Sequence, residues 1–499
     1  MNTPPSSQAQ DRQPPPAAPS QLGSKARSGT IWIVGAFGIG QIVRLATNIA
    51  LAALLFEEAF ALMALVTAVM VGLAMFSDVG LQQNVIQSPR GDDPDFLNTA
   101  WTIQVIRGLV LALLACAVAW PMAAFYSAND PMAQELRWLI PIVAISAIFD
   151  GLRSPAALSA ARHLRVAELV RIEAGVTALN TVLILVLAWQ TRSVYALAIG
   201  AAVSSAVHCW ATYVFLPGGP VRAVLEGRAV RSIFSFGKWI FVSTMLFFLS
   251  AQIDRLTFAS LYPLADVGVY SIAAGLALIV PGVVGKLQSA IVFPYYSRLL
   301  DEGEPLPTAF ARATAPVMLA STYIVTLLMV CAESFFSFAY DHRYAEAGQI
   351  LPILALAVWF SNLSSLYGTA FLAKGVPQWL AMASAVKVAA FGALFFVLSR
   401  FESGIVAGSI IVLLAEIATA MVSRWFGYRL GLKAFRVEVQ MLMTLVALSG
   451  SCLLIMKGTS AIAGLHPLVQ LLGAGAVVTA ILAPLLVRQL WPLIRGARR

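Results

Sequence analysis

The chain has 499 residues, of which 59% are hydrophobic and 11% are charged, and its formal net charge at neutral pH is +9. Soluble domains carry about 25% charged residues, so this composition excludes an ordinary soluble protein and indicates an integral membrane protein. Residues 1–28 are rich in proline, glutamine, serine and alanine and contain no apolar stretch. They predict a disordered tail and not a signal peptide.

Long apolar segments follow the tail in close succession. We expect about fourteen membrane-spanning helices, because each segment reaches the roughly 20 residues that cross the hydrocarbon core. In chain order they occupy residues 29–55, 59–77, 97–125, 137–158, 171–190, 193–216, 233–261, 266–290, 310–333, 348–372, 377–400, 403–428, 438–457 and 464–489. The predicted fold class is therefore an all-α polytopic membrane protein.

Lysine and arginine are concentrated in every second loop. The rich loops lie at 162–171, 222–231 and 424–436, and further basic residues lie in the two terminal segments. Because basic loops stay on the cytoplasmic side, this pattern predicts that both termini are cytoplasmic. The positive charge is therefore interpreted as a topology signal, and no nucleic-acid-binding module is recognisable.

The chain resembles itself at an offset of slightly more than two hundred residues. The matches pair residues 41–45 with 252–256, residues 80–89 with 285–294, and residues 139–145 with 350–356. Six spans separate the copies, so the repeats have the same orientation in the membrane. Transporters built from such repeats bind substrate between the two halves and alternate access by rocking one half against the other.

The repeat divides the chain into segments. We predict a cytoplasmic tail at 1–28, a six-helix lobe at 29–217, a basic connector at 218–232, a second six-helix lobe at 233–430, and two extra helices with a basic tail at 431–499. Pro217-Gly-Gly-Pro220 at the start of the connector is typical of a hinge. The loops are short, which argues against an enzyme that holds a catalytic site in a loop domain.

Basic side chains inside the apolar segments are the strongest functional signal. They are Arg44, Arg107, Arg153, Lys238, Arg255, Lys286 and Lys387. A charge at bilayer depth costs about 2.5–3.5 kcal/mol on insertion scales, so it normally faces a bundle interior or a wet cavity. The carboxylates at similar depth are fewer, chiefly Asp150, Asp254 and Glu416. This excess of cations predicts an anionic ligand.

The pattern Gln-x-x-Arg occurs three times within the predicted spans. The pairs are Gln41 with Arg44, Gln104 with Arg107, and Gln252 with Arg255. Residues three apart share one face of a helix, and each guanidinium offers a planar fork that fits phosphate oxygens. Arg44 and Arg255 hold matching positions in the two repeats. We therefore predict that the three pairs line a central cavity and bind a diphosphate.

The other intramembrane charges have competing interpretations. Arg153 and Arg255 have acidic neighbours that would neutralise them, while Lys238 and Lys286 would reach the inner interface, and Lys387 is a lower-ranked cavity residue. Asp78 and Glu416 are candidates for binding a coupling proton or cation, with helix packing as the alternative. The four cysteines and four histidines have no metal-ligand spacing, so neither a metal nor another cofactor is expected.

Several motifs occur in the order and spacing of one family. They are the segments 76–87 and 155–169 in the first lobe, and Phe236-Gly-Lys-Trp239, Asp254-Arg255, residues 268–273 and residues 293–298 in the second. From about residue 29 to 430 the chain resembles the Wzx-type oligosaccharide flippases. These are the polysaccharide transporter branch of the multidrug/oligosaccharidyl-lipid/polysaccharide (MOP) exporter superfamily.

The resemblance implies a V-shaped pair of six-helix lobes in the bacterial cytoplasmic (inner) membrane. It also implies flipping of undecaprenyl-diphosphate-linked oligosaccharide repeat units for exopolysaccharide, capsule or O-antigen (lipopolysaccharide) synthesis, with no catalytic residue because no covalent bond changes. The expected partners are the lipid-linked oligosaccharide, membrane lipid, a coupling ion (H⁺ or Na⁺), and a polysaccharide polymerase with chain-length proteins.

Three other functions remain open at this point. A cation-coupled multidrug exporter of the same superfamily would favour acidic cavity residues, but residues 29–55 contain Arg44 and no carboxylate. A flippase for the peptidoglycan precursor would share the diphosphate. A membrane glycan polymerase, ligase or glycosyltransferase would require a large external loop with catalytic side chains.

Overall fold

The computed structural model describes residues 40–77, 90–163, 165–219, 221–292, 305–398, 404–463 and 466–496, with a few single positions between these ranges. The predicted tail at 1–28 lies outside them. Every regular element within these ranges is a helix. Twelve helical segments in the described ranges, some of them two consecutive elements taken together, are long and apolar enough to cross a membrane. With the shorter apolar helix Gly40–Leu54 and helix α9, they match the fourteen predicted segments, so the predicted fold class is confirmed.

The first lobe begins with helix Gly40–Leu54. It continues with α2 (Glu57–Phe76), α4 (Pro94–Ser127), η1 (Pro131–Glu135), α5 (Leu136–Gly151), α6 (Ala156–Arg162), α7 (Val166–Thr191) and α8 (Tyr195–Phe215). The second lobe contains α9 (Gly227–Phe258), α10 (Leu264–Ala277), α11 (Ile279–Leu287), η2 (Gln288–Val292), α13 (Leu306–Ala339), η3 (His342–Tyr344), α14 (Ala347–Ala373), α15 (Gln378–Leu398) and α16 (Ile405–Arg429). The extra helices α17 (Phe435–Ala463) and α18 (Pro467–Gly496) follow.

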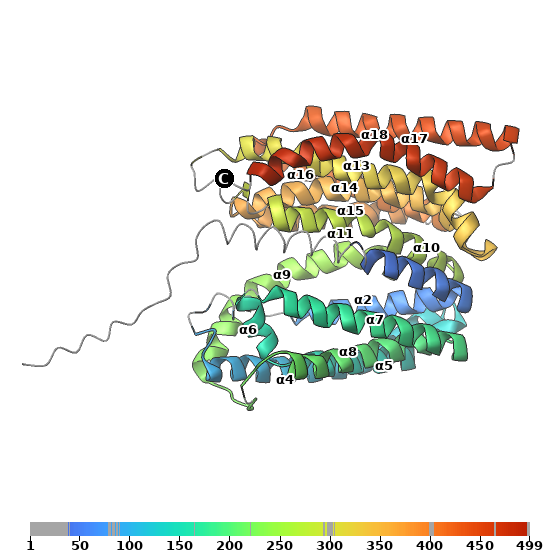
Figure 1. The fold of residues 1–499 in the computed structure, drawn as a ribbon. Coiled ribbons are helices and arrows are strands. Elements are labelled where there is room, and N and C mark those ends of the chain that lie inside the picture. Colours follow the sequence, from blue (N-terminus) through green and yellow to red (C-terminus); the bar gives the residue numbers. More distant parts are fainter. Residues whose placement is uncertain are drawn as a thin grey trace, which may run out of the picture.

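Figure 1 shows the two lobes as separate bundles, with α9 between them and with α17 and α18 at the outer side of the second bundle. Helix α2 connects the bundles because it packs against both α9 and α10. The approach is close at Gly268 of α10, where a Cβ atom would lie 2.0 Å from the backbone oxygen of Glu57. The largest cluster of buried apolar side chains accordingly includes residues of both lobes, such as Leu62 and Val267.

Two predicted spans are interrupted in the structure. The fourth was expected over 137–158, but α5 ends at Gly151 and the short helix α6 begins at Ala156, behind Pro155. Proline has no backbone N–H and disfavours helical geometry in the preceding residue, so Pro155 favours an end of the helix before it. The eighth was expected over 266–290, but α10 ends at Ala277, α11 follows, and the last turn is a π-helix.

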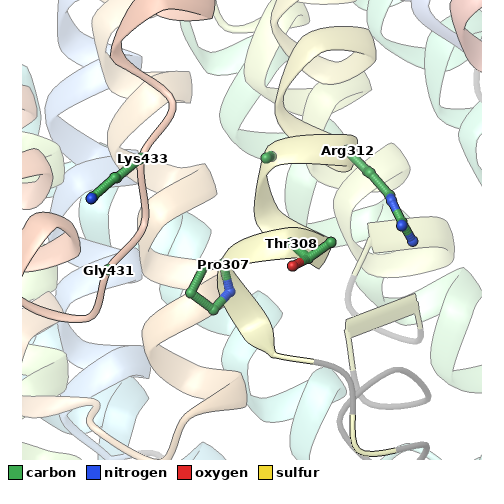
Figure 2. A pocket seen from close by; sticks show the side chains of 6 residues that line it. Pro307, Thr308, Arg312, Gly431 and Lys433 are labelled. Atoms are coloured by element: carbon green, nitrogen blue, oxygen red, sulfur yellow. The ribbon is translucent and has the colours of Figure 1, made fainter.

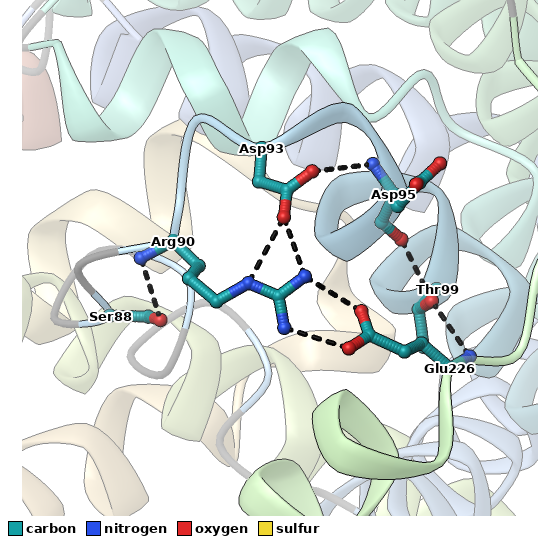
Figure 3. A network of polar contacts seen from close by, with 6 residues as sticks. All are labelled: Ser88, Arg90, Asp93, Asp95, Thr99 and Glu226. Carbon is teal, nitrogen blue, oxygen red and sulfur yellow. Dashed lines mark hydrogen bonds and ion pairs between the residues drawn. The ribbon is translucent and has the colours of Figure 1, made fainter.

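The connector between the lobes lies along the first turns of α4 (Figure 3). Three backbone N–H groups donate to α4 side chains, from Arg222 to Asn98 (3.1 Å), from Val224 to Thr102 (3.1 Å) and from Glu226 to Thr99 (3.2 Å). Alternate residues of the extended segment 221–226 are therefore bound to the first lobe. We propose that this segment moves with the first lobe and that the hinge lies at the start of α9.

Arg90 holds the end of the connector in place (Figure 3). Its guanidinium donates to both carboxylate oxygens of Glu226, at 2.9 and 2.7 Å, and to Asp93, at 3.0 and 2.5 Å. Asp93 also caps α4 through the backbone N–H of Asp95. The bonds from Arg90 lower the pKa of the Asp93 carboxyl group. Any stability this carboxylate adds is therefore present above its ordinary pKa and disappears only as the pH falls through the lowered value.

Candidate functional site

The Gln104 and Arg107 side chains connect α4 to the ends of two neighbouring helices. Gln104 Nε2 donates to the backbone oxygen of Asp150 (2.8 Å) near the end of α5. Arg107 donates from Nη2 to the backbone oxygen of Ala74 (2.7 Å) and from Nε to Ser77 Oγ (2.8 Å) at the end of α2. The last carbonyl groups of a helix lack intrahelical partners, so these bonds satisfy them. The Gln104 and Arg107 pair therefore contributes to packing within the first lobe.

The Gln41 and Arg44 pair lies on helix Gly40–Leu54, and both side chains have polar atoms without a hydrogen-bond partner among the described residues. Arg44 is exposed and makes no hydrogen bond or ion pair with another described residue. Gln41 Oε1 is buried and has no partner among the described residues either. Buried polar atoms nearly always have hydrogen-bond partners, so Gln41 Oε1 retains an acceptor position for a further donor.

The Gln252 and Arg255 pair lies near the end of α9. Arg255 Nη1 donates to Gln252 Oε1 (3.2 Å), while Arg255 Nε is buried without a partner in the described structure. The neighbouring Asp254 carboxylate does not neutralise Arg255 by hydrogen bonding. It accepts instead from the hydroxyl group of Tyr270 on α10. The Arg255 guanidinium therefore retains donors for a further acceptor.

Two of the lower-ranked cations form ion pairs. Lys387 Nζ of α15 lies 2.6 Å from Glu416 Oε1 of α16, and the two side chains are only 17% and 8% exposed. Arg153 Nη2 lies 2.6 Å from Asp150 Oδ1, which is the structural pairing that the sequence offered as an alternative. Glu416, the candidate coupling residue, thus has a cation beside it already.

The remaining predicted site residues are Lys286, Lys238 and Asp78. Lys286 is exposed at the end of α11, immediately before the π-helical turn. Lys238 belongs to α9, but its side chain lies outside the described structure, as does Asp78. Within the described ranges, no three side chains of the histidine, cysteine, aspartate or glutamate type are grouped as a metal site would require.

A cavity of about 490 Å³ opens where α13 begins, next to the loop between α16 and α17. It is lined by Pro307, Thr308, Ala311, Arg312, Gly431 and Lys433. Figure 2 shows that the side chains of Arg312 and Lys433 point away from each other. The two cations therefore do not converge on one anion, and this cavity is not the predicted diphosphate site.

The lobes are also bonded to each other at the predicted outer ends of their helices. Asn129 Nδ2 donates to the backbone oxygen of Tyr262 (2.8 Å), and Asp130 Oδ2 accepts from the N–H of Leu264 (3.1 Å). At the same end, Arg343 Nη1 lies 3.4 Å from Glu57 Oε2. The sequence did not indicate these contacts, because ordinary loop residues make them and several involve backbone atoms.

The arrangement of helices resembles that of known transporters. A structure titled lipid II flippase MurJ, inward closed conformation, is 12% identical in sequence, with a TM-score of 0.69 over 91% of this chain and 99% of that chain. An inward-facing multidrug resistance MATE family transporter of the MOP superfamily is 14% identical, with a TM-score of 0.61 over 79% of this chain and 94% of that chain. The chain is thus a multi-pass membrane protein with the fold of MOP-superfamily transporters.

Sequence comparisons narrow this class. Residues 50–349 match the family model described as polysaccharide biosynthesis protein, and the chain belongs to that family. The teichuronic acid biosynthesis protein TuaB of Bacillus subtilis is 21% identical over 301 residues, which are 60% of this chain and 61% of TuaB. The lipopolysaccharide biosynthesis protein WzxC of Escherichia coli is 20% identical over 175 residues, 32% of this chain and 36% of WzxC. The family predicted from the sequence is confirmed.

Proposed function

We propose that this protein flips undecaprenyl-diphosphate-linked oligosaccharide units across the bacterial cytoplasmic membrane for the synthesis of a surface polysaccharide. The family and its relatives in teichuronic acid and lipopolysaccharide synthesis support this proposal. The observation that carries it is the state of the two arginines at matching positions of the predicted repeats. Arg44 and Arg255 have no carboxylate partner among the described residues, whereas Arg153 and Lys387 are paired with acids.

The proposed chemistry is binding without a covalent step. A diphosphate and a glycan cannot cross hydrocarbon unaided, because polar groups without partners cost several kcal/mol each (about 2–7). Arginine forks would replace water around the diphosphate, while the polyprenyl tail stays in the lipid. The cargo must also leave, so a small number of cations suits transport better than a fully enclosing site.

The same proposal includes an orientation and a conformational state. The basic loops support cytoplasmic termini, and the contacts of Asn129, Asp130 and Arg343 then lie at the external ends of the helices. With the lobes bonded there, the cargo would enter from the cytoplasmic side. Release would require those contacts to break as the second lobe rocks against the first.

Substitution of the two arginines tests the binding role. Arg44→Ala and Arg255→Ala are each expected to reduce glycan export about tenfold or more in a host that lacks its own flippase, because hydrogen bonds to charged groups contribute about 1.5–3 kcal/mol. The lysine variants should restore export in part, since lysine keeps the charge but not the planar fork.

Arg429→Ala is the matched control, because Arg429 is exposed, lies over the Trp425 ring in the last turn of α16, and falls beyond the predicted span 403–428. It should export normally. Membrane abundance of each variant is measured in parallel. Full export by an Arg44/Arg107/Arg255 triple alanine variant would contradict the proposed binding role.

A peptidoglycan-precursor flippase is the second candidate, because the structural likeness to the lipid II flippase extends over 91% of the chain. Both cargoes carry a polyprenyl diphosphate, so the arginines do not discriminate between them. A parallel assay with lipid II and with an undecaprenyl-diphosphate-linked oligosaccharide separates the two. The first candidate predicts that only the oligosaccharide is translocated quickly.

A further inference from the structure

Asp254 and Arg255 are adjacent in α9, and their opposite charges would cancel if they formed a pair. The structure has a different arrangement. The hydroxyl group of Tyr270, on the next helix along the chain, donates to Asp254 Oδ2. Consecutive helix residues point in directions about 100° apart, which makes this division of partners geometrically simple. The Asp254 carboxylate therefore accepts from Tyr270, and Arg255 donates to the neutral side chain of Gln252.

Packing fixes the Tyr270 ring in place. The residue is only 1% exposed. Its ring meets Phe258 edge to face, with centroids 5.0 Å apart and planes at 80°. Phe258 in turn packs against Phe391 of α15, at 6.0 Å. A ring held between two helices in this way cannot turn its hydroxyl group to another acceptor without repacking both neighbours.

Glu416 is the second carboxylate in this region, and it also has a partner. Phe391 and Lys387 lie four residues apart on α15, so the pair that Lys387 forms with Glu416 is close to this aromatic cluster. Glu416 is bonded to Lys387 at 2.6 Å. Both acids therefore have a donor, and the Arg255 guanidinium, with Nε buried and without a partner in the described structure, is the group that still requires an acceptor.

We propose that Tyr270 is a positioning residue that keeps Arg255 available for the diphosphate of the cargo by holding the Asp254 carboxylate. This inference rests on the proposed function and assigns a role to a residue that does not itself bind the cargo. It predicts how the site fails. Without the hydroxyl group, Asp254 lies at low dielectric with no donor, and the adjacent guanidinium is the cation free to neutralise it.

The test measures binding of undecaprenyl diphosphate to the purified full-length protein in detergent. Tyr270→Phe is expected to raise the Kd about tenfold, because Arg255 then bonds Asp254 in place of the ligand. Tyr270→Phe combined with Asp254→Asn should bring the Kd back to within about twofold of the wild type, since the competing charge is gone. Asp254→Asn alone should bind at least as tightly as the wild type.

The thermal midpoint without ligand is measured for every variant. A merely structural tyrosine would lower this midpoint in Tyr270→Phe while leaving the Kd unchanged, and that result would overturn the positioning role. Weaker binding by Asp254→Asn would also overturn it, even if Tyr270→Phe did not fold, because the carboxylate would then be needed for binding. A wild-type protein that failed to bind undecaprenyl diphosphate would instead overturn the proposed function, and the inference with it.

Discussion

Replacing Lys387 with methionine is expected to lower the free energy of unfolding by about 3–5 kcal/mol, because the change leaves Glu416 as an unpaired buried charge. The pair joins α15 to α16 at 2.6 Å, and Glu416 is only 8% exposed. Methionine keeps most of the volume of lysine, so a cavity contributes little to the expected loss. Chemical or thermal unfolding in detergent measures the effect.

The double variant Lys387→Met/Glu416→Leu is the control for this prediction. Replacement of a buried ion pair by apolar residues of similar volume is often neutral or stabilising, by about 1–4 kcal/mol. We therefore expect the double variant to be much more stable than Lys387→Met alone. Equal stability of the two variants would contradict the assignment of a buried, mutually dependent pair. Export by the folded double variant also decides whether Glu416 couples transport to an ion, because a coupling residue could not be replaced by leucine.

A disulfide between the lobes at their predicted outer ends is expected to abolish export until it is reduced. The pair to be cross-linked is Asn129→Cys with Tyr262→Cys, where Asn129 Nδ2 lies 2.8 Å from the Tyr262 backbone oxygen. A disulfide tolerates only short separations, about 4.4–6.8 Å between Cα atoms, so it would hold the lobes together at this end. Alternating access requires that end to open, and we expect at least a tenfold loss of export.

A second disulfide serves as the control. Both disulfides are made in a background where the native cysteines Cys116, Cys209, Cys331 and Cys452 are replaced. Asn98→Cys with Arg222→Cys joins the connector to α4, at a position where the side chain of Asn98 already accepts from the Arg222 N–H. This bond lies within one moving body, so export should continue. Loss of export with the control bond would contradict a connector that moves with the first lobe. Unimpaired export with the outer bond formed would contradict rocking of the lobes.

The number and position of the membrane helices could be predicted from the sequence, because a twenty-residue apolar segment is a strong physical signal. Breaks within the helices were less visible. Residues 137–158 are apolar enough for one span, but Pro155 separates α5 from α6. Hydropathy measures how apolar a segment is and does not show where the backbone leaves helical geometry. A proline alone does not show it either, because α5 continues through Pro141.

The polar partners of the intramembrane charges could be predicted only where they are local. Asp150 lies in the last turn of α5 and Arg153 lies just after its end, and the two form the ion pair that their three-residue spacing allows. Lys387 and Glu416 come from different helices, so no spacing rule connects them. The sequence predicts that Gln104 and Arg107 share one helix face. It does not predict that this face contacts the ends of α2 and α5. Long-range packing decides which polar side chains find partners.

Transport by the purified protein is measured as translocation in proteoliposomes that contain the protein and an undecaprenyl-diphosphate-linked oligosaccharide. A membrane-impermeant glycosidase reports how much of the lipid has moved to the outer leaflet. We expect rapid movement with the wild-type protein and at least a tenfold slower rate with the Arg44→Ala/Arg255→Ala variant, which lacks both guanidinium groups without a carboxylate partner. Movement no faster than in protein-free vesicles, or an equal rate with the double variant, would contradict this expectation.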